Sequence, residues 1–233
     1  MARADLPPRY HTRWRQPYED NIEKRLQDGM TILDIGAGRH PTLPPEARPL
    51  DVTYIGLDVS REEMVAAGAG AYHETYVVDI THAVPELIDT IDLAVSWQVF
   101  EHVKPLDAAL NNIHRYLRPG GTLVSMFSGR WSAFGVVNQL IPHAIGKPIV
   151  ERVMKRRAAN QPVFPAYYDR CSARQLRVMT AAWQSVEIVP FFRGATYFNS
   201  SAILTRFYLW WEAEVHARNA ANLATHYLLI AHK

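Results

Sequence analysis

The sequence predicts an α/β fold built on a mostly parallel sheet, and three observations support this prediction. Short apolar runs rich in Val, Ile, Leu or Tyr alternate with helical segments between residues 31 and 127, an order that gives parallel sheets with right-handed crossovers. The first run, T-I-L-D-I-G-A-G, ends in two glycines, as when a buried strand enters a tight turn beside a ligand. The second run, Y-I-G-L-D, ends in Asp58, 22 positions after Gly36.

The expected elements follow one another along the chain. Apolar residues at helical spacing predict an amphipathic lead-in helix over residues 10–27; they are Tyr10, Trp14, Tyr18, Ile22 and Leu26. Strands are then expected wherever a short apolar run occurs, namely at 31–36, 53–58, 74–79, 91–97 and 122–127. Helices are expected between these strands at 61–68, 84–89 and 106–117.

The pattern changes after the fifth strand. Residues 129–170 hold Gly, Pro, aromatic residues and a basic stretch, which indicates an insertion over the carboxyl edge of the sheet, where open α/β folds bind ligands. The next expected helix, 172–183, starts at Ser172, a residue type that caps helices well. A strand at 186–192, a second insertion at 195–222 with a helix through F-Y-L-W-W-E-A-E-V-H, and a last strand at 223–231 follow.

Length, charge and cysteine content narrow the class of protein. A chain of 233 residues can bury a core, and we expect one domain, 1–233. The net charge of +2 gives no reason to expect nucleic acid as a partner. The single cysteine, Cys171, excludes an internal disulfide and favours a reducing compartment, so we expect a cytoplasmic protein. The N-terminus lacks the apolar core of a signal peptide, and no stretch is long and apolar enough to span a bilayer.

The two glycines after the first strand also fit a nicotinamide-binding fold. The third glycine of that fingerprint would stand at position 41, which is Pro41 here. Proline suits the first turn of a helix but does not supply the close helix–strand packing that the third glycine gives. Farther along, D-L-A-V-S-W-Q-V-F-E-H-V (92–103) runs from a buried strand into a helix start, and L-R-P-G-G-T-L-V (117–124) turns into a fifth strand.

Taken in order, these stretches resemble the class I S-adenosylmethionine (SAM)-dependent methyltransferases. The matching stretches are L-D-I-G-A-G, G-L-D-V-S, V-V-D-I, V-F-E-H-V and L-R-P-G-G. The resemblance implies a Rossmann-like sheet of seven strands with helices on both faces, the last strand being antiparallel between the fifth and the sixth. It also implies SAM as cofactor and a lid formed by the insertions 129–170 and 195–222. Many members carry a further glycine where this chain has His40, which implies a bulkier loop at the edge of the pocket.

The lead-in helix has two interpretations. In related methyltransferases such a segment often closes over the cofactor. The aromatic side chains of residues 10–27 are equally suited to covering one face of the sheet.

The first two strands are expected to supply half of the cofactor site. Small residues after the first strand let the backbone approach the cofactor; they are Gly36, Ala37 and Gly38. Asp34 either acts on the amino group of the cofactor or fixes the glycine turn by accepting backbone hydrogen bonds. Asp58 is expected to accept hydrogen bonds from the ribose hydroxyls, and its alternative role is to cap the helix that begins near Arg61.

The third and fourth strands are expected to supply the rest of the cofactor site. Asp79 would accept a hydrogen bond from the adenine amino group, with Ile80 beside the ring. The fourth strand ends where the methionine part of SAM should lie, in Ser96, Trp97 and Gln98. Trp97 is also large enough to belong to the ordinary core.

An alcohol acceptor needs a base, because its own proton is held far too tightly at neutral pH. Histidine is the usual base near neutrality. His102 follows the fourth strand, near the expected position of the methyl group, and His143 lies in the first insertion. Glu101 would orient a histidine or bind a metal. The sequence has no C-x-x-C or H-x-x-x-H pair to supply metal ligands. Scattered acidic residues are the remaining candidates to bind magnesium as a second cofactor.

The acceptor site is expected in the aromatic C-terminal half of the chain, at Tyr167, Tyr168 and Tyr197. Aromatic faces beside hydroxyl groups suit a sugar and suit a planar phenol equally well. The stretches G-A-G-R-H-P and F-P-A-Y-Y-D resemble the actinobacterial sugar O-methyltransferases of methylmannose polysaccharide synthesis. This resemblance makes a hydroxyl of a sugar or oligosaccharide the first choice of acceptor.

Other interpretations of function and assembly stay open. One alternative to a sugar acceptor is an enzyme that methylates a lipid or a quinone-like phenol. Another is a regulatory protein that binds SAM without turnover. If the protein is an enzyme, we expect its acceptor to be a small molecule. The aromatic segment Phe207–Trp211 is expected to be buried against a lid or in a homodimer, because soluble monomers rarely expose so many adjacent apolar groups.

Overall fold

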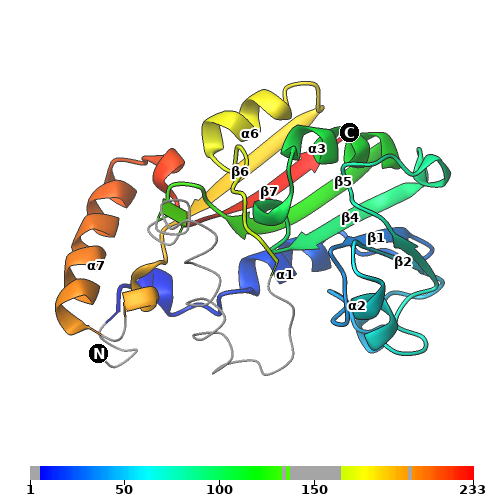
Figure 1. Cartoon of the computed structure of the whole chain (residues 1–233), viewed down its shortest axis with the longest axis horizontal. Coiled ribbons are helices and arrows are strands. Elements are labelled where there is room, and N and C mark those ends of the chain that lie inside the picture. Colours follow the sequence, from blue (N-terminus) through cyan, green and yellow to red (C-terminus); the bar gives the residue numbers. More distant parts are fainter. Residues whose placement is uncertain (1–5, 133–134, 137–163, 199–200) are drawn as a thin grey trace.

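The fold is organised around one sheet of seven strands in the order β3-β2-β1-β4-β5-β7-β6 (Figure 1). The computed structural model describes residues 6–132, 135–136, 164–198 and 201–233. The strands are β1 (Thr31–Ile35), β2 (Thr53–Asp58), β3 (Glu74–Val77), β4 (Ile91–Trp97), β5 (Leu117–Ser128), β6 (Ser185–Phe191) and β7 (His226–His232). Neighbouring strands from β3 to β5 are parallel, whereas β7 is antiparallel to both β5 and β6. The predicted sheet, including the place and direction of its last strand, is therefore confirmed.

Helices pack on the sheet through separate apolar clusters. They are α1 (Gln16–Glu23), α2 (Arg61–Ala66), α3 (Leu106–Tyr116), α6 (Ala173–Met179) and α7 (Ala202–Ala217). Buried residues of α3 and α6, such as Leu110 and Leu176, join one cluster with the sheet. Tyr18 and Ile22 of α1 join a second cluster with other residues of the strands. Figure 1 shows α7 at the end of the molecule that lies away from β2 and α2.

Several predicted helix boundaries were wrong, and local backbone chemistry explains why. The lead-in helix expected over 10–27 is only α1, with Pro17 in its first turn and a short 3₁₀ helix, Pro8–Tyr10, before it. Proline lacks the N–H that an earlier start of α1 would need at this position. The helix expected at 84–89 is one 3₁₀ turn, Pro85–Leu87, and Asp89, with a φ of 56°, cannot continue it.

Two further differences concern the ends of elements. The helix predicted over 172–183 is α6, which ends at Met179, and the side chain of Ser172 makes no capping hydrogen bond to it. The turn predicted at L-R-P-G-G is the beginning of β5, where pairing with β4 shifts register between Ile91 and Leu93. The shift lets the strand start early at Leu117 and still align with β4 from Thr122 onward.

The face of the sheet covered by α3 supports a stability prediction. Leu110 in α3 is fully buried, whereas Leu50 in a loop is 72% exposed. Leu110→Ala should lower the free energy of unfolding by about 2–5 kcal/mol, because it removes buried methyl groups and leaves a cavity. Leu50→Ala, the matched control, should change it by no more than about 0.5 kcal/mol. Urea unfolding of both variants measures the difference, and equal losses would contradict the packing described for α3.

Candidate functional site

A cavity of about 330 Å³ opens at the carboxyl ends of β1, β2 and β4. This is the edge where the order of strands reverses around β1, the usual ligand position in open α/β sheets. Six residues predicted to bind a cofactor line it, namely Gly36, Asp58, Asp79, Ile80, Trp97 and Gln98. His102 and Tyr167, predicted for the acceptor side, line the same cavity.

Gly36 forms the turn at the end of β1. Its φ is +68°, and a Cβ at this position would overlap the side chain of Val99. Its N–H donates to the carbonyl oxygen of Leu57 over 2.8 Å, which ties the turn to β2. Glycine is therefore required here for both torsion and space, and the exposed backbone of the turn forms one wall of the cavity.

Asp58 ends β2 with one carboxylate oxygen engaged. Oδ1 accepts a hydrogen bond from the backbone N–H of Ser60 over 2.8 Å. Burial raises the pKa of Asp58, and the backbone N–H groups of Ser60 and Gly38 oppose that rise. A partly buried carboxylate that lines a cavity is suited to accept hydrogen bonds from ligand hydroxyls. The residue also contacts the start of α2 through Ser60, so the two roles predicted for it are compatible.

Asp79 and Ile80 follow β3 along the next part of the cavity. Oδ1 of Asp79 accepts hydrogen bonds from the N–H and the hydroxyl of Thr81 over 2.9 and 2.8 Å. Ile80 is buried, and its carbonyl oxygen accepts from Nδ2 of Asn112 in α3. The pair thus combines a fixed carboxylate with an apolar side chain, which suits a flat heterocycle that carries a donor group.

The end of β4 holds polar atoms without partners. Oγ of Ser96, which is fully buried, and Nε2 of Gln98 make no hydrogen bond within the described part of the chain. Oε1 of Gln98 accepts from the hydroxyl of Ser128 over 3.1 Å, which fixes the amide. Buried polar groups normally find a partner, and the amide nitrogen of Gln98 has none among the described residues.

Asp34, Ala37, Gly38 and Ser96 are not among the residues that line the cavity. The carboxylate of Asp34 accepts hydrogen bonds from the N–H and hydroxyl of Thr42 and from the hydroxyl of Tyr54. These bonds hold the loop that follows the glycine turn. They favour the structural alternative for Asp34, and its contact with the cofactor stays a prediction.

His102 is an imidazole side chain at the cavity. It lines the cavity, and its Nδ1 lies 2.9 Å from the carbonyl oxygen of Pro165. A carbonyl oxygen can only accept, so Nδ1 donates a proton to it, and in the neutral form of the ring Nε2 then has a free lone pair.

Glu101 lies behind His102 and does not line the cavity. Burial raises the pKa of its carboxyl group, with His102 the largest opposing influence. Its carbonyl oxygen accepts from the N–H groups of Tyr167 and Tyr168, and Oε1 accepts from the N–H of Ser128. Glu101 therefore fixes the segment that carries the predicted acceptor residues.

The predicted acceptor residues are not gathered in one place. Tyr167 is exposed at the cavity, Tyr168 is buried beneath it, and Tyr197 lies outside the lining. His143 falls outside the described residues. Phe164 and Pro165 line the cavity beside Tyr167 and were not predicted; the stretch F-P-A-Y-Y-D contained the signal, but only its tyrosines were chosen. Val59, Val99 and Val103 were also missed, because single valines near strand ends carry no distinguishing pattern.

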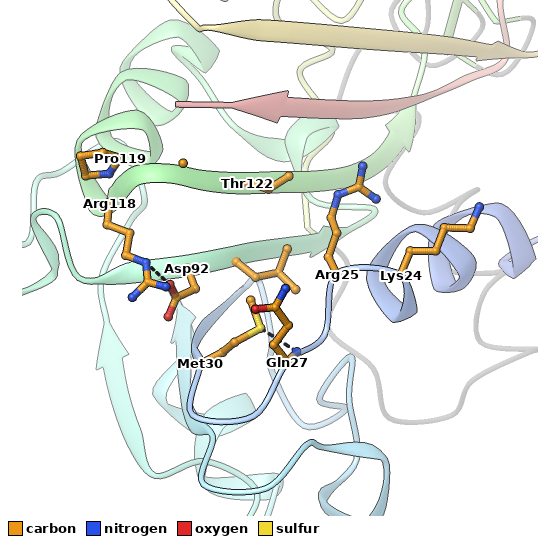
Figure 2. Close-up of a pocket in the computed structure, with 10 residues that line it drawn as sticks. Lys24, Arg25, Gln27, Met30, Asp92, Arg118, Pro119 and Thr122 are labelled. Carbon is orange, nitrogen blue, oxygen red and sulfur yellow. Dashed lines mark hydrogen bonds and ion pairs between the residues drawn. The ribbon is translucent and has the colours of Figure 1, made fainter.

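A second cavity, of about 260 Å³, lies at the opposite edge of the sheet, at the amino ends of β1 and β4. Figure 2 shows Arg118 in β5 reaching Asp92 in β4, with which it forms an ion pair. The other oxygen of Asp92 accepts from the N–H of Thr31 over 2.8 Å. None of the predicted site residues lines this cavity, and the strand ends that meet there are those that open α/β folds do not use for ligands.

Neither a metal site nor a membrane span is found in the described ranges. No group of three or more His, Cys, Asp or Glu side chains there is arranged to hold a metal ion. No helix there is long and apolar enough to cross a bilayer.

The sequence profile of a methyltransferase domain matches residues 9–185 of the chain. The chain belongs to this methyltransferase family. Its fold is that of the class I methyltransferases. The cavity at β1, β2 and β4 has a glycine turn and two strand-end carboxylates, which suit S-adenosylmethionine as a ligand.

Similar proteins share this fold. An uncharacterized methyltransferase of Mycolicibacterium vanbaalenii is 30% identical over 139 residues, 58% of this chain and 54% of that protein. A ubiquinone biosynthesis O-methyltransferase of Paramagnetospirillum magneticum is 30% identical over 108 residues, which cover 45% of this chain and 43% of that one. The chain thus spans about half the length of these curated relatives. A SAM-dependent methyltransferase from Archaeoglobus fulgidus superposes with a TM-score of 0.58 at 16% identity, covering 94% of this chain and 92% of that structure.

The cofactor side of the cavity yields a binding prediction. Asp58→Asn keeps an oxygen for the N–H of Ser60 but removes the charge. It should weaken binding of S-adenosylhomocysteine by about 1–3 kcal/mol, because hydrogen bonds to a charged acceptor are the stronger ones. Glu74→Ala, on the exposed edge strand β3, is the control and should bind normally. Calorimetric titration measures both, and an unchanged affinity for the Asp58 variant would leave that residue only as a cap of α2.

Asp34 makes stability depend on pH. Burial raises its pKa to about 6, although the hydrogen bonds from Tyr54 and Thr42 oppose the rise. The unfolded chain titrates near 3.9, so the folded state binds the proton more tightly between about pH 4 and pH 6. Its contribution to the free energy of unfolding should therefore fall by up to about 3 kcal/mol as pH rises through this window. Asp34→Asn should flatten that part of the urea-unfolding profile; an identical profile in wild type and variant would be inconsistent with a raised pKa.

Proposed function

We propose that the methyltransferase transfers the methyl group of SAM to a hydroxyl oxygen, with His102 as the base. The observation that carries this proposal is the hydrogen bond of Nδ1 of His102 to the carbonyl oxygen of Pro165, in a residue that lines the cavity. An alcohol or phenol must lose its proton as the new bond forms, and an imidazole with a free Nε2 can take it. An amine or carbon acceptor has no hydroxyl proton for the imidazole to remove.

The cofactor would be held by the residues that line the cavity. When bound, SAM supplies a sulfonium methyl group that is open to in-line attack. Asp58 would accept from the ribose hydroxyls, and Asp79 with Ile80 would hold the adenine. The backbone at Gly36 and the amide of Gln98 would face the methionine part. These roles rest on the order of the residues around the cavity and on the unpartnered amide of Gln98.

The segment after the first insertion connects the base to the acceptor side. Besides the bond between His102 and Pro165, Oδ2 of Asp169 accepts from the N–H of Leu106 over 3.0 Å. Arg170 forms an ion pair of 2.6 Å with Asp107 in the first turn of α3. The wall formed by Phe164, Pro165 and Tyr167 is therefore anchored both at His102 and at the start of α3, which follows His102 closely in the chain.

We favour a planar phenol, of the quinone-like kind, as acceptor. The wall beside the cavity consists of Phe164, Pro165 and Tyr167. The rings of Phe164 and Tyr167 offer two flat apolar faces, which suit stacking on an aromatic ring. Several relatives at 27–30% identity, over less than half of this chain, are named ubiquinone biosynthesis O-methyltransferases, which supports the same choice. The sugar acceptor favoured by the sequence stays a prediction, because aromatic side chains also stack on sugars.

A screen with labelled SAM distinguishes these acceptors. Phenols with a neighbouring hydroxyl should be methylated at least about tenfold faster than free sugars or oligosaccharides, a preference worth about 1.4 kcal/mol at the transition state. Faster transfer to sugars would restore the acceptor predicted from the sequence. Failure with every hydroxyl compound, in a protein that binds S-adenosylhomocysteine, would support a regulatory role without turnover.

Replacement of the base tests the chemistry. His102→Ala should lower the rate of transfer to a hydroxyl by about 10²–10⁴-fold while affinity for the cofactor stays nearly constant. His216→Ala, on the exposed end of α7, serves as the control and should keep wild-type turnover. A near-normal rate for the His102 variant would show that the base lies elsewhere.

A further inference from the structure

Helix α7 buries a face of mixed polarity and leaves large apolar side chains on its outer face. Thr205, Tyr208, Glu212 and Val215 are buried against the molecule. On the opposite side, Ile203 is 81%, Phe207 63% and Trp210 59% exposed. The aromatic segment predicted to be covered is thus covered only in part, since Tyr208 is buried and its neighbour Phe207 is not.

A buried carboxylate fixes this orientation. Glu212 is fully buried. It accepts a hydrogen bond from the N–H of Gly194 over 2.5 Å. It also accepts one from the hydroxyl of Tyr10. Arg9 lies 3.4 Å from the same carboxylate and compensates its charge. A buried charge that loses its partners is very costly. The helix therefore cannot turn about its axis to bury Phe207 and Trp210 without breaking this network.

The outward face is one stripe along the helix. Along one helical face, residues at spacings of three or four are exposed or half-buried, namely Ile203, Arg206, Phe207, Trp210, Ala213, Glu214 and Ala217. Figure 1 shows α7 at the outer end of the described part of the molecule. Monomers seldom leave a stripe with adjacent Phe and Trp side chains in water, and the ring centroids of Phe207 and Trp210 are only 5.8 Å apart.

We propose that this stripe packs antiparallel against the same stripe of a second copy of the chain, with a two-fold axis near Trp210. In that register Trp210 meets its own copy at the axis, and the other two large residues meet small ones. Position 207 faces position 213, so Phe207 lies against Ala213 of the partner subunit. Position 203 faces position 217, so Ile203 lies against Ala217 of the partner subunit. A self-complementary surface of this kind is what a two-fold interface requires.

The charges of the stripe match the same register. Position 206 faces position 214, which brings Arg206 to Glu214 of the partner subunit. Arg206 has no ion pair with the carboxylates that the structure describes. Glu214 pairs within its own helix with Arg218 at 3.1 Å, and its side chain remains 46% exposed. The two-fold axis would form the new pair twice, once on each side of Trp210.

The dimer should depend on concentration. One helix from each subunit buries less than the standard interface of about 800 Å² per partner. The matched charges favour a second copy over an anionic membrane surface, because anionic lipids would repel Glu214 and favour a stripe with basic residues alone.

The test is sedimentation equilibrium of the whole chain and of charge variants. Wild type should pass from monomer to dimer as its concentration rises. Arg206→Glu or Glu214→Arg alone should raise the dissociation constant by about tenfold or more, because like charges then face each other twice. The double variant should return to within about threefold of wild type. Arg218→Glu changes the charge of the same helix at a position that faces Ala202, and it should leave the dimer in place.

The result that overturns the proposal is equally definite. Wild type that remains monomeric at every concentration, or single variants that dimerise as wild type does, would exclude this interface. So would a monomer that floats with vesicles of anionic phospholipid, since that outcome assigns the stripe to a membrane. Each variant should bind S-adenosylhomocysteine with wild-type affinity, because none of these positions lines the cavity; this confirms that a lost dimer does not reflect an unfolded chain.

Discussion

At the end of β1 the chain must turn with a positive φ at Gly36, in a space that Val99 closes to any side chain. The cavity depends on this constraint. Because the turn at Gly36 follows β1, and β1 lies between β2 and β4, the bare backbone of the turn faces the crevice between the two halves of the sheet. Asp58 and Gln98 then reach the same crevice from the strands on either side. A side chain at position 36 would overlap Val99, so the turn could not keep this form.

The opposite wall depends on contacts between distant parts of the chain. His102 in the turn after β4 and Pro165 are 63 positions apart and are joined by one hydrogen bond. The carbonyl oxygen of Glu101 and the carboxylate of Asp169 add further bonds between the same two segments. Together these bonds hold the apolar wall in place, and the bond from His102 also fixes which ring nitrogen donates to Pro165.

The sequence was informative where function is encoded in consecutive residues. Gly36 and Asp58 were identified because glycine turns and strand-end acids leave short patterns, and the parallel order of strands brings them together. Asp34 shows the limit of such patterns, since its carboxylate turns to Thr42 and Tyr54 rather than to the cavity. The contact of His102 with Pro165 and the buried carboxylate of Glu212 arise from tertiary packing, and no periodicity in the sequence distinguishes them. Within one chain the expected burial of Phe207–Trp211 is met only in part, since Tyr208 is buried and Phe207 is exposed.

The central claim is that this cavity directs a methyl group to oxygen. The most direct measurement is the product formed from SAM labelled with ¹³C at its methyl group, in the presence of an acceptor that offers both hydroxyl and amino groups. The account predicts one labelled methyl group, bonded to oxygen, as shown by NMR and mass spectrometry of the product. A labelled methyl group on nitrogen or carbon, with the hydroxyl groups unchanged, would contradict it.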